Sequence, residues 1–367
     1  PARLLLSGPC GGTIAAEGGS SPLGEPNLPA GDMGGASFQL SIIQDGRTTR
    51  VAEGEVDGCP VRLPMAEMST IGAGGGSIAW VDEAGRLRVG PQSAGSAPGP
   101  ACYGRGATQA TVTDANIVLG RMDAGGFMNG TMPLDRDAAV NALRNTICVP
   151  LGLGIEEAAE GVIAVAASHM ANAIRLCLFS RGLDPDDFAL VSFGGAGGLH
   201  AAAVAEEIGV GRIIYPRGAS TLSAFGMLWT DIVHDFARTR IVAATEDSIA
   251  AIGETIRAMS VSARAALKRD GIPEANWSFD VALDLRYKGQ GYELSIPIGA
   301  PTLDADALDR TVAAFHAAHE QRFSHSDTGA PVEIVTVRIS ARGLLPMAGT
   351  QEYQAGPPTT TLNRKVY

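Results

Sequence analysis

The sequence predicts an α/β lobe followed by a smaller α+β unit. The first indication is an apolar strand at residues 189–193, a helix at 199–208 and a strand at 212–215, which together form a βαβ unit. The second is the stretch 155–180, whose helical periodicity and apolar character are those of a buried central helix. The third is a new series of elements after Thr239, so that the 367 residues divide into two cores, as their number also suggests.

The remaining elements are expected in this order. Short β-rich runs separated by turns predict an antiparallel meander, with strands at 38–43, 49–56, 77–81 and 86–89. A loop at 91–106 is too rich in proline and glycine for regular structure, and a loop of that length in a compact domain is usually functional. Helices follow at 111–121 and 135–148. Beyond Thr239 we expect helices at 248–268 and 305–322 and strands at 277–285, 292–296 and 332–341.

These elements predict four segments. We expect a connector to a preceding lobe at 1–30, the main lobe at 31–240, the α+β unit at 241–346 and an extended, proline-rich tail at 347–367. The sequence starts with Pro1 instead of methionine. We therefore expect it to be a piece of a longer protein or a processed chain.

Composition excludes several classes of function. The net charge of −11 is spread along the chain with no basic stripe, which disfavours nucleic-acid binding. Five cysteines without CxxC spacing disfavour both a disulfide framework and a structural zinc site, and fit a reducing cytoplasm. The longest apolar helical stretch is interrupted by Ser168, His169 and Asn172, so we expect no membrane span.

Three glycine-rich tracts, at 32–35, 71–77 and 193–198, each join an apolar strand to a turn or a helix start. Glycine permits positive φ and leaves backbone N–H groups open to an anion, and the dipole of a following helix favours negative charge there. A single tract is usually an ordinary turn. Three tracts, none with the Walker or dinucleotide spacing, favour a nucleotide held between glycine-rich hairpins. We expect a structural role for His200, which lies in the helix after the third tract.

Several motifs in the chain occur together in one known family. They lie at 7–12, 32–35, 70–80, 89–95, 98–106, 111–116, 193–200 and 319–323. In these motifs the sequence resembles the A-type subunit of the hydantoinase/oxoprolinase group, which includes ATP-dependent N-methylhydantoinases, 5-oxoprolinases and the acetone and acetophenone carboxylases. The block 70–116 is the most specific part of the resemblance.

The resemblance implies a ribonuclease-H-like lobe of the actin and sugar-kinase superfamily, in which two lobes clamp ATP with Mg or another divalent metal. The preceding lobe, with its first phosphate loop, is missing from this sequence, so we expect the isolated chain not to hydrolyse ATP. The tract at 32–35 resembles the second phosphate-binding loop and the one at 194–197 the adenosine-binding loop. The candidate cofactor-binding residues are Gly34, Gly35, Ser37, Gly74, Gly75, Gly194, Gly195, Ala196 and Gly197.

Two carboxylates are candidate catalytic residues. Asp32, at the mouth of the glycine hairpin, is the candidate for a phosphate contact or for holding the metal; the alternative is that it only caps the turn. Asp114 either faces the cleft or caps the helix that follows it, and the sequence favours neither.

The sequence also departs from the family pattern. The hairpin motif normally reads DMGGT followed by S-T-D, whereas this chain has Ala36, Ser37, Phe38 and Gln39, so a hydroxyl and a carboxylate are lost. Glu67 and Ser69 stand where an aspartate and a histidine are common. The helix expected after Gly12 is interrupted at 18–22. These departures bear on whether the chain still supports ATP turnover.

The resemblance implies three functions in order of preference. The first is a subunit of an ATP-dependent hydrolase that phosphorylates the amide oxygen of a cyclic amide, such as 5-oxoproline or a hydantoin, together with a B-type partner subunit. The second is the same machinery in a ketone carboxylase, with phosphoryl transfer to an enol or to bicarbonate. The third is a non-catalytic scaffold with a degenerate nucleotide site. The chain alone does not identify the substrate.

Overall fold

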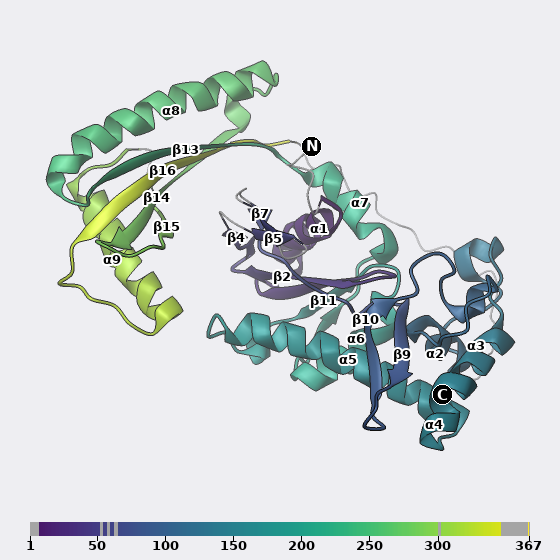
Figure 1. Ribbon diagram of the computed structural model, residues 1–367. Coiled ribbons are helices and arrows are strands. Elements are labelled where there is room, and N and C mark those ends of the chain that lie inside the picture. The colour runs from purple at the N-terminus through teal and green to yellow at the C-terminus, as the bar shows by residue number, and fades with distance from the viewer. Residues whose placement is uncertain are drawn as a thin grey trace. The chain divides into compact units, whose positions relative to one another are not determined.

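The computed structural model describes residues 7–51, 54–56, 59–61, 65–299, 302–345 and 366. The chain divides into a first compact unit, which extends to Leu228, and a second from Trp229 to Ala348 (Figure 1). Each unit has its own hydrophobic core. The expected tail at 347–367 lies outside the described residues apart from Val366.

The first unit is built on a mixed sheet with the strand order β12-β11-β1-β2-β3, in which β8 also pairs with β2. Strand β1 is antiparallel to β2 and parallel to β11, which is in turn parallel to β12. This is the strand arrangement of a ribonuclease-H-like lobe, and it confirms the predicted fold class. The strands are β1 (Leu28–Met33), β2 (Phe38–Gln44), β3 (Arg47–Thr48), β8 (Ser69–Ile71), β11 (Leu190–Phe193) and β12 (Ile213–Ile214).

Helices cover both faces of this sheet. Alternate residues of a strand point to opposite faces. Leu28 and Ala30 of β1 therefore join the core beneath α1 (Ser7–Leu23) and α7 (Leu222–Gly226). Met33 joins the core shared with α5 (Ile155–Phe179) and α6 (Gly197–Ile208). The βαβ unit predicted around the third glycine tract is β11, α6 and β12.

Helices α1 and α7 cross with their backbones in contact. A Cβ atom on Gly226 would overlap the carbonyl oxygen of Gly11, and one on Gly11 would overlap that of Ser223. The predicted interruption of this helix at 18–22 was wrong, because α1 continues to Leu23. Packing on the sheet outweighs the weak helix propensity of glycine, about 1 kcal/mol per residue.

The predicted meander is divided among several sheets. Only the first of its strands enters the central sheet, as β2, while β9 (Ser77–Val81) and β10 (Leu87–Ser93) form a separate hairpin. The run expected at 49–56 is described in part, within the short pairs β4 (Arg50–Val51) with β7 (Met65–Ala66) and β5 (Gly54–Val56) with β6 (Cys59–Val61).

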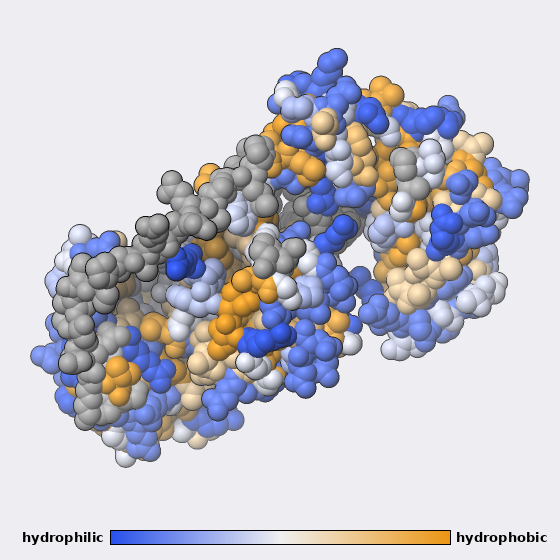
Figure 2. All heavy atoms as spheres, turned by 180° about the vertical axis from the view of Figure 1, so that it is seen from behind, coloured by the Kyte–Doolittle hydropathy of each residue, from blue (hydrophilic) through white to orange (hydrophobic). Residues whose placement is uncertain are grey.

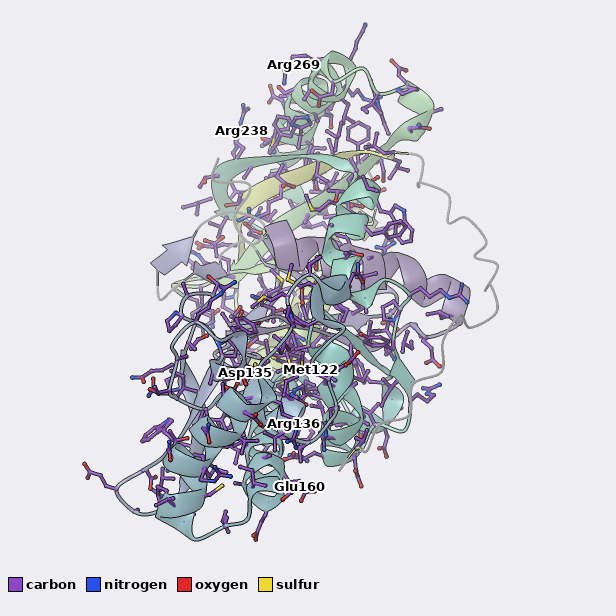
Figure 3. The ribbon with its side chains drawn as sticks, turned by 90° about the vertical axis from the view of Figure 1, so that its right-hand side faces the viewer. Met122, Asp135, Arg136, Glu160, Arg238 and Arg269 are labelled. Atoms are coloured by element: carbon purple, nitrogen blue, oxygen red, sulfur yellow. The ribbon has the colours of Figure 1, made fainter. Side chains whose placement is uncertain are left out.

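Three helices follow the β9–β10 hairpin, namely α2 (Val112–Val118), α3 (Arg136–Leu143) and the short α4 (Val149–Leu151). Asp135 caps α3 by accepting a hydrogen bond from the amide of Ala138. Arg136, which Figure 3 labels together with Asp135, donates to the carbonyl oxygen of Val118 at the end of α2. The Arg136 contact thus fastens the start of α3 to the end of α2.

Among the described residues, α5 is the one helix long and apolar enough to cross a bilayer, and half of its most apolar window is buried inside the protein. Its buried residues, including Val162 and Met170, belong to the core of the first unit. A central core helix meets the same criterion of length and composition as a membrane span. The surface seen in Figure 2 is covered mainly by hydrophilic side chains, with smaller hydrophobic areas between them.

The second unit is an antiparallel sheet with the order β13-β16-β14-β15 and two helices on one of its faces. Phe279 of β14 meets Arg264 of α8 and Tyr287 of the same strand meets Phe315 of α9, so both helices pack on the same side. Ion pairs such as Arg338–Asp284 lie on the opposite face. The elements are β13 (Ile232–Ala243), α8 (Ile249–Arg269), β14 (Trp277–Tyr287), β15 (Leu294–Pro297), α9 (Ala305–Phe323) and β16 (Val332–Gly343).

The boundary between the two units along the chain falls between Leu228 and Trp229, earlier than the expected boundary between 240 and 241. Residues 232–240 are part of β13, which pairs with β16 along most of its length. Most of the side chains of β13 are exposed, because it is an edge strand. Its sequence therefore lacks the apolar alternation by which a strand is recognised.

Candidate functional site

Three neighbouring strands of the central sheet end at one edge. Because β12, β11 and β1 are parallel, their carboxyl ends lie side by side, with Asp32 of β1 opposite Phe193 of β11. The hairpin turn 34–37, which joins β1 to β2, and the β11–α6 loop 194–196 both leave from this edge. Open α/β sheets bind ligands at the carboxyl ends of their strands.

The hairpin turn presents open backbone. Its ends are closed by a hydrogen bond of 3.1 Å from the amide of Gly34 to the carbonyl oxygen of Ser37. Gly35 and Ala36 are exposed, and a Cβ atom on Gly35 would meet nothing within 4 Å. In the described part of the chain, the amides of Gly35 and Ala36 donate to no other group. Two N–H groups are thus available to an anion.

The β11–α6 loop lies directly against β1. Gly194 has a φ of +86°, and a Cβ atom there would overlap Oδ1 of Asp32 and lie 2.5 Å from the carbonyl oxygen of Met33. The amide of Ala196 donates to that same oxygen at 3.0 Å. Gly195 is exposed, with open space around it. Because α6 starts at Gly197, the positive end of its dipole lies at the loop.

Asp32 lies between the two loops. Its Oδ2 accepts a hydrogen bond of 3.0 Å from the hydroxyl of Ser223 on α7. Partial burial raises the pKa of the Asp32 carboxyl, while the Ser223 hydrogen bond acts in the opposite direction. The predicted site residues that the structure brings together are therefore Asp32, Gly34, Gly35, Gly194, Gly195, Ala196 and Gly197.

Asp32 is also the candidate metal ligand. The residues that the structure describes contain no group of three or more His, Cys, Asp or Glu side chains arranged to hold a metal. A single carboxylate fits Mg²⁺, which keeps several waters and is commonly bound by one or two carboxylates together with substrate phosphates. Such a metal would be shared with bound phosphate and not held by the protein alone.

Gly74 and Gly75 do not lie on the open side of the hairpin turn. Both are buried behind it, in the support loop 72–77. The amide of Gly75 donates to the carbonyl oxygen of Gly34 at 3.1 Å, and a Cβ atom on Gly74 would lie 2.6 Å from the amide nitrogen of Ser37. The expectation that they bind the cofactor is therefore corrected: they hold the hairpin turn in place.

Asp114 is fully buried and its hydrogen bonds are internal. Its oxygens accept from the amide and hydroxyl of Thr111 at 2.9 and 2.8 Å, and from the amides of Ala101 at 3.2 Å and Cys102 at 2.8 Å. Thr111 and Asp114 form a capping box at the start of α2. Of the two open alternatives the geometry supports capping, with Asp114 also anchoring the proline- and glycine-rich loop.

Two side chains in the altered part of the hairpin motif form a hydrogen bond with each other. The hydroxyl of Ser37 accepts a hydrogen bond of 2.9 Å from the side-chain amide of Gln39. Gln39 lies directly opposite Asp32 in the β1–β2 pair. The carboxylate that the family pattern has at position 39 would thus be the cross-strand neighbour of Asp32, and here a neutral amide replaces it.

Sequence reasoning missed Ser223. This residue is 191 positions from its partner Asp32 and lies in a short apolar helix, where a serine is unremarkable. The available signal was the small residues Ser223 and Gly226, which allow α7 to cross α1 closely enough to bring the Ser223 hydroxyl to the end of β1.

Comparison with known proteins gives a consistent set of relatives. The family model described as hydantoinase/oxoprolinase matches residues 1–236. The caprolactamase alpha subunit of Pseudomonas jessenii is 37% identical over 341 residues, which is 92% of this chain and 49% of that protein. The acetophenone carboxylase gamma subunit of Aromatoleum aromaticum is 34% identical over 333 residues, 88% of this chain and 45% of that protein.

A solved structure agrees with these matches. The crystal structure of the ATP-dependent caprolactamase from Pseudomonas jessenii superimposes with a TM-score of 0.83 at 35% identity, covering 96% of this chain and 51% of that chain. The chain thus spans about half the length of these relatives.

Proposed function

Because the chain belongs to the hydantoinase/oxoprolinase family, we propose that it is the ATP-binding part of an enzyme that hydrolyses a cyclic amide. The observation that carries the proposal is the pair of open glycine loops on either side of Asp32 at one edge of the sheet. The name of the ATP-dependent caprolactamase supports both the nucleotide and the substrate class, since a lactam is a cyclic amide.

The residues at the sheet edge fit a nucleoside triphosphate. The free amides of Gly35 and Ala36 would hold phosphate oxygens, and Gly195 would allow the sugar and base to approach the backbone above α6. When bound, ATP would supply the phosphoryl group that turns the amide oxygen into a leaving group. The contribution of this chain is charge neutralisation and alignment.

Asp32 would hold the divalent cation that accompanies the nucleotide. Its Oδ2 is fixed by Ser223, and its Oδ1 lies beside Gly194, close to both loops. A cation there relieves the cost of keeping a partly buried carboxylate ionised. Ser223 then acts as a positioning residue that fixes the rotamer of Asp32.

The substrate and the partners are further parts of the proposal. We expect a B-type partner subunit to complete the hydrolysis, since the caprolactamase and acetophenone carboxylase relatives are both named as subunits. The second candidate function is a ketone carboxylase, which the acetophenone carboxylase relative favours. Product formation that depends on bicarbonate would distinguish carboxylation from hydrolysis.

The first experiment is a calorimetric titration of this chain with Mg-ATP, using the variants Gly35→Val and Gly211→Val. Both glycines face open space, so neither valine clashes with the protein, but only Gly35 lies in the hairpin turn. We expect saturable binding by the parent and by Gly211→Val, and binding at least about tenfold weaker by Gly35→Val, because the valine occupies the space of a phosphate. Equal binding by all three proteins would contradict the proposed site.

A further inference from the structure

We propose that Tyr215 is the residue on which the base of the bound nucleotide stacks, a role that goes beyond the phosphate contacts described above. The inference rests on the proposed function, because it assigns a specificity residue to the same nucleotide site.

Tyr215 is an exposed aromatic side chain at the edge of the sheet that carries the candidate site. It directly follows β12 (Ile213–Ile214) and is therefore at the carboxyl end of a strand, at the edge where the hairpin turn and the β11–α6 loop also lie. It is 56% exposed. An aromatic residue that served only to fill the core would be covered.

The ring lies against the first turn of α6. A Cβ atom on Gly198 would lie 2.7 Å from Cζ of Tyr215 and 2.8 Å from its hydroxyl oxygen, so the missing side chain of Gly198 makes room for the ring. Gly198 follows the β11–α6 loop by two residues. The backbone of α6 thus supports the ring on one side, and the exposed remainder is available to a ligand.

The strand order places the groups of the site in a row. From the middle of the sheet outward, Asp32 lies one position before the end of β1, the β11–α6 loop follows β11, and Tyr215 follows β12. Neighbouring strands are about 4.8 Å apart, so Tyr215 is about 10 Å from the strand of Asp32 across the sheet. A nucleotide with its phosphates at the hairpin turn and its sugar over the β11–α6 loop would bring its base to Tyr215.

The chemistry of this contact is the stacking of a base on an aromatic ring. Such a contact strengthens binding by about tenfold or more per base, and it depends on the π-face of the base instead of its hydrogen-bonding groups. Tyr215 therefore favours a nucleotide over inorganic phosphates and contributes little to the choice between adenine and guanine.

The test is calorimetric titration of this chain with Mg-ATP and, separately, with Mg-tripolyphosphate, which has the phosphates but no base. We expect Tyr215→Ala to weaken ATP binding by about tenfold or more and to leave tripolyphosphate binding unchanged. Tyr215→Phe should bind both as the parent does. Ile213→Ala is the matched control, because Ile213 is exposed on the same strand and, two residues away, on the same side.

A second variant gives a direct signal. In Tyr215→Trp, ATP should change the emission of the new tryptophan and tripolyphosphate should not. The inference is overturned if Tyr215→Ala binds ATP within twofold of the parent, or if it loses ATP and tripolyphosphate equally, since equal losses would indicate a structural role. A parent chain that binds tripolyphosphate but not ATP also overturns it. A parent that binds neither ligand overturns the proposed function itself, and the two failures are thereby distinguished.

Discussion

Asp32 is more useful for binding than for stability. Burial raises the pKa of its carboxyl, so the folded chain binds this proton more tightly than the unfolded chain does. The stabilising contribution of the protonated Asp32 is therefore lost as the pH rises from 3.8, the ordinary pKa of this side chain, through the raised pKa in the folded chain. At neutral pH the ionised group destabilises the fold. Among the described side chains, the hydroxyl of Ser223 is the one that donates a hydrogen bond to Asp32, and this bond offsets part of the cost of burying the ionised carboxylate.

We therefore predict that Asp32→Asn raises the melting temperature of the chain at pH 7 while it weakens Mg-ATP binding at least about tenfold. The gain in stability should shrink as the pH is lowered towards 3.8, because the folded chain takes up the Asp32 proton at a higher pH than the unfolded chain does. Thermal melts at several pH values and titration with Mg-ATP measure the two effects. A variant with unchanged stability and unchanged binding would remove Asp32 from the site.

His200 gives a second prediction at the level of single residues. Burial, and to a lesser extent the charge of Arg121, lowers its pKa from 6.5 to about 4. The native imidazole is thus neutral, and its Nε2 lies 3.3 Å from the side-chain amide nitrogen of Asn116. The unfolded state takes up a proton that the native state does not, so stability falls as the pH drops from 6.5 towards 4.

The free energy of unfolding of the parent should therefore fall by about 3 kcal/mol more between pH 7 and pH 4 than that of His200→Gln. Urea denaturation of both proteins at the two pH values measures this difference. Identical pH dependence in the two proteins would mean that His200 is protonated in the native state as easily as in the unfolded state.

At the residue level, the sequence identified residues that lie together at the sheet edge better than it assigned roles to them. Asp32 and the tracts at 34–35 and 194–197 were found because glycine beside a strand end is a local signal. The roles of Gly75 and Asp114 depend on which group each one bonds, the Gly34 carbonyl for the first and the Cys102 amide for the second. Those partners are distant in the sequence, so no local pattern reveals them.

Among the elements, the crossing of α1 and α7 is the contact most sensitive to added volume. A Cβ atom on Gly226 would overlap the backbone of Gly11, and a backbone cannot rotate away as a side chain can. We predict that Gly226→Ala lowers the free energy of unfolding by at least about 1–3 kcal/mol. Gly19→Ala in α1 is the control, because a Cβ atom there meets nothing within 4 Å.

The control variant should be neutral or up to about 1 kcal/mol more stable, since alanine is the better helix former. Urea denaturation of the two variants and the parent measures both effects. Equal stability of Gly226→Ala and the parent would show that the two helices separate at little cost.

Elements with strong periodicity were predicted and weakly patterned ones were not. The βαβ unit and the long helices α5, α8 and α9 follow from apolar spacing, and the family predicted from the motifs is confirmed by the family model. Strand β13 was missed because an exposed edge strand carries no alternation. The sequence did not predict that the strands of the expected meander belong to different sheets, because tertiary packing decides which strands pair.

For the whole molecule, separate cores predict separate unfolding. Phe315 is fully buried in the core of the second unit, whereas Phe323 in the same helix is 39% exposed. Phe315→Ala should destabilise the second unit by about 3–5 kcal/mol, and Phe323→Ala much less. The first unit, with the proposed nucleotide site, should keep its stability, because chains with two cores seldom unfold in one step.

Hydrogen exchange followed by mass spectrometry reports on each unit separately. In Phe315→Ala, amides of α8 and β16 should exchange faster, while those of β1 and β11 should keep the protection of the parent. Equal loss of protection in both units would show that they unfold as one cooperative body.

The support loop has a mechanical consequence for any ligand that binds. The hairpin turn is bonded to the support loop through the amides of Gly75 and Gly76, and Thr113 donates to the carbonyl of Gly75 from the first turn of α2. Asp114 extends this linkage to Cys102. Hydrogen bonds therefore connect the hairpin turn to α2 and to the loop at 98–106, so a displacement of the turn by a ligand would have to break or move these contacts as well.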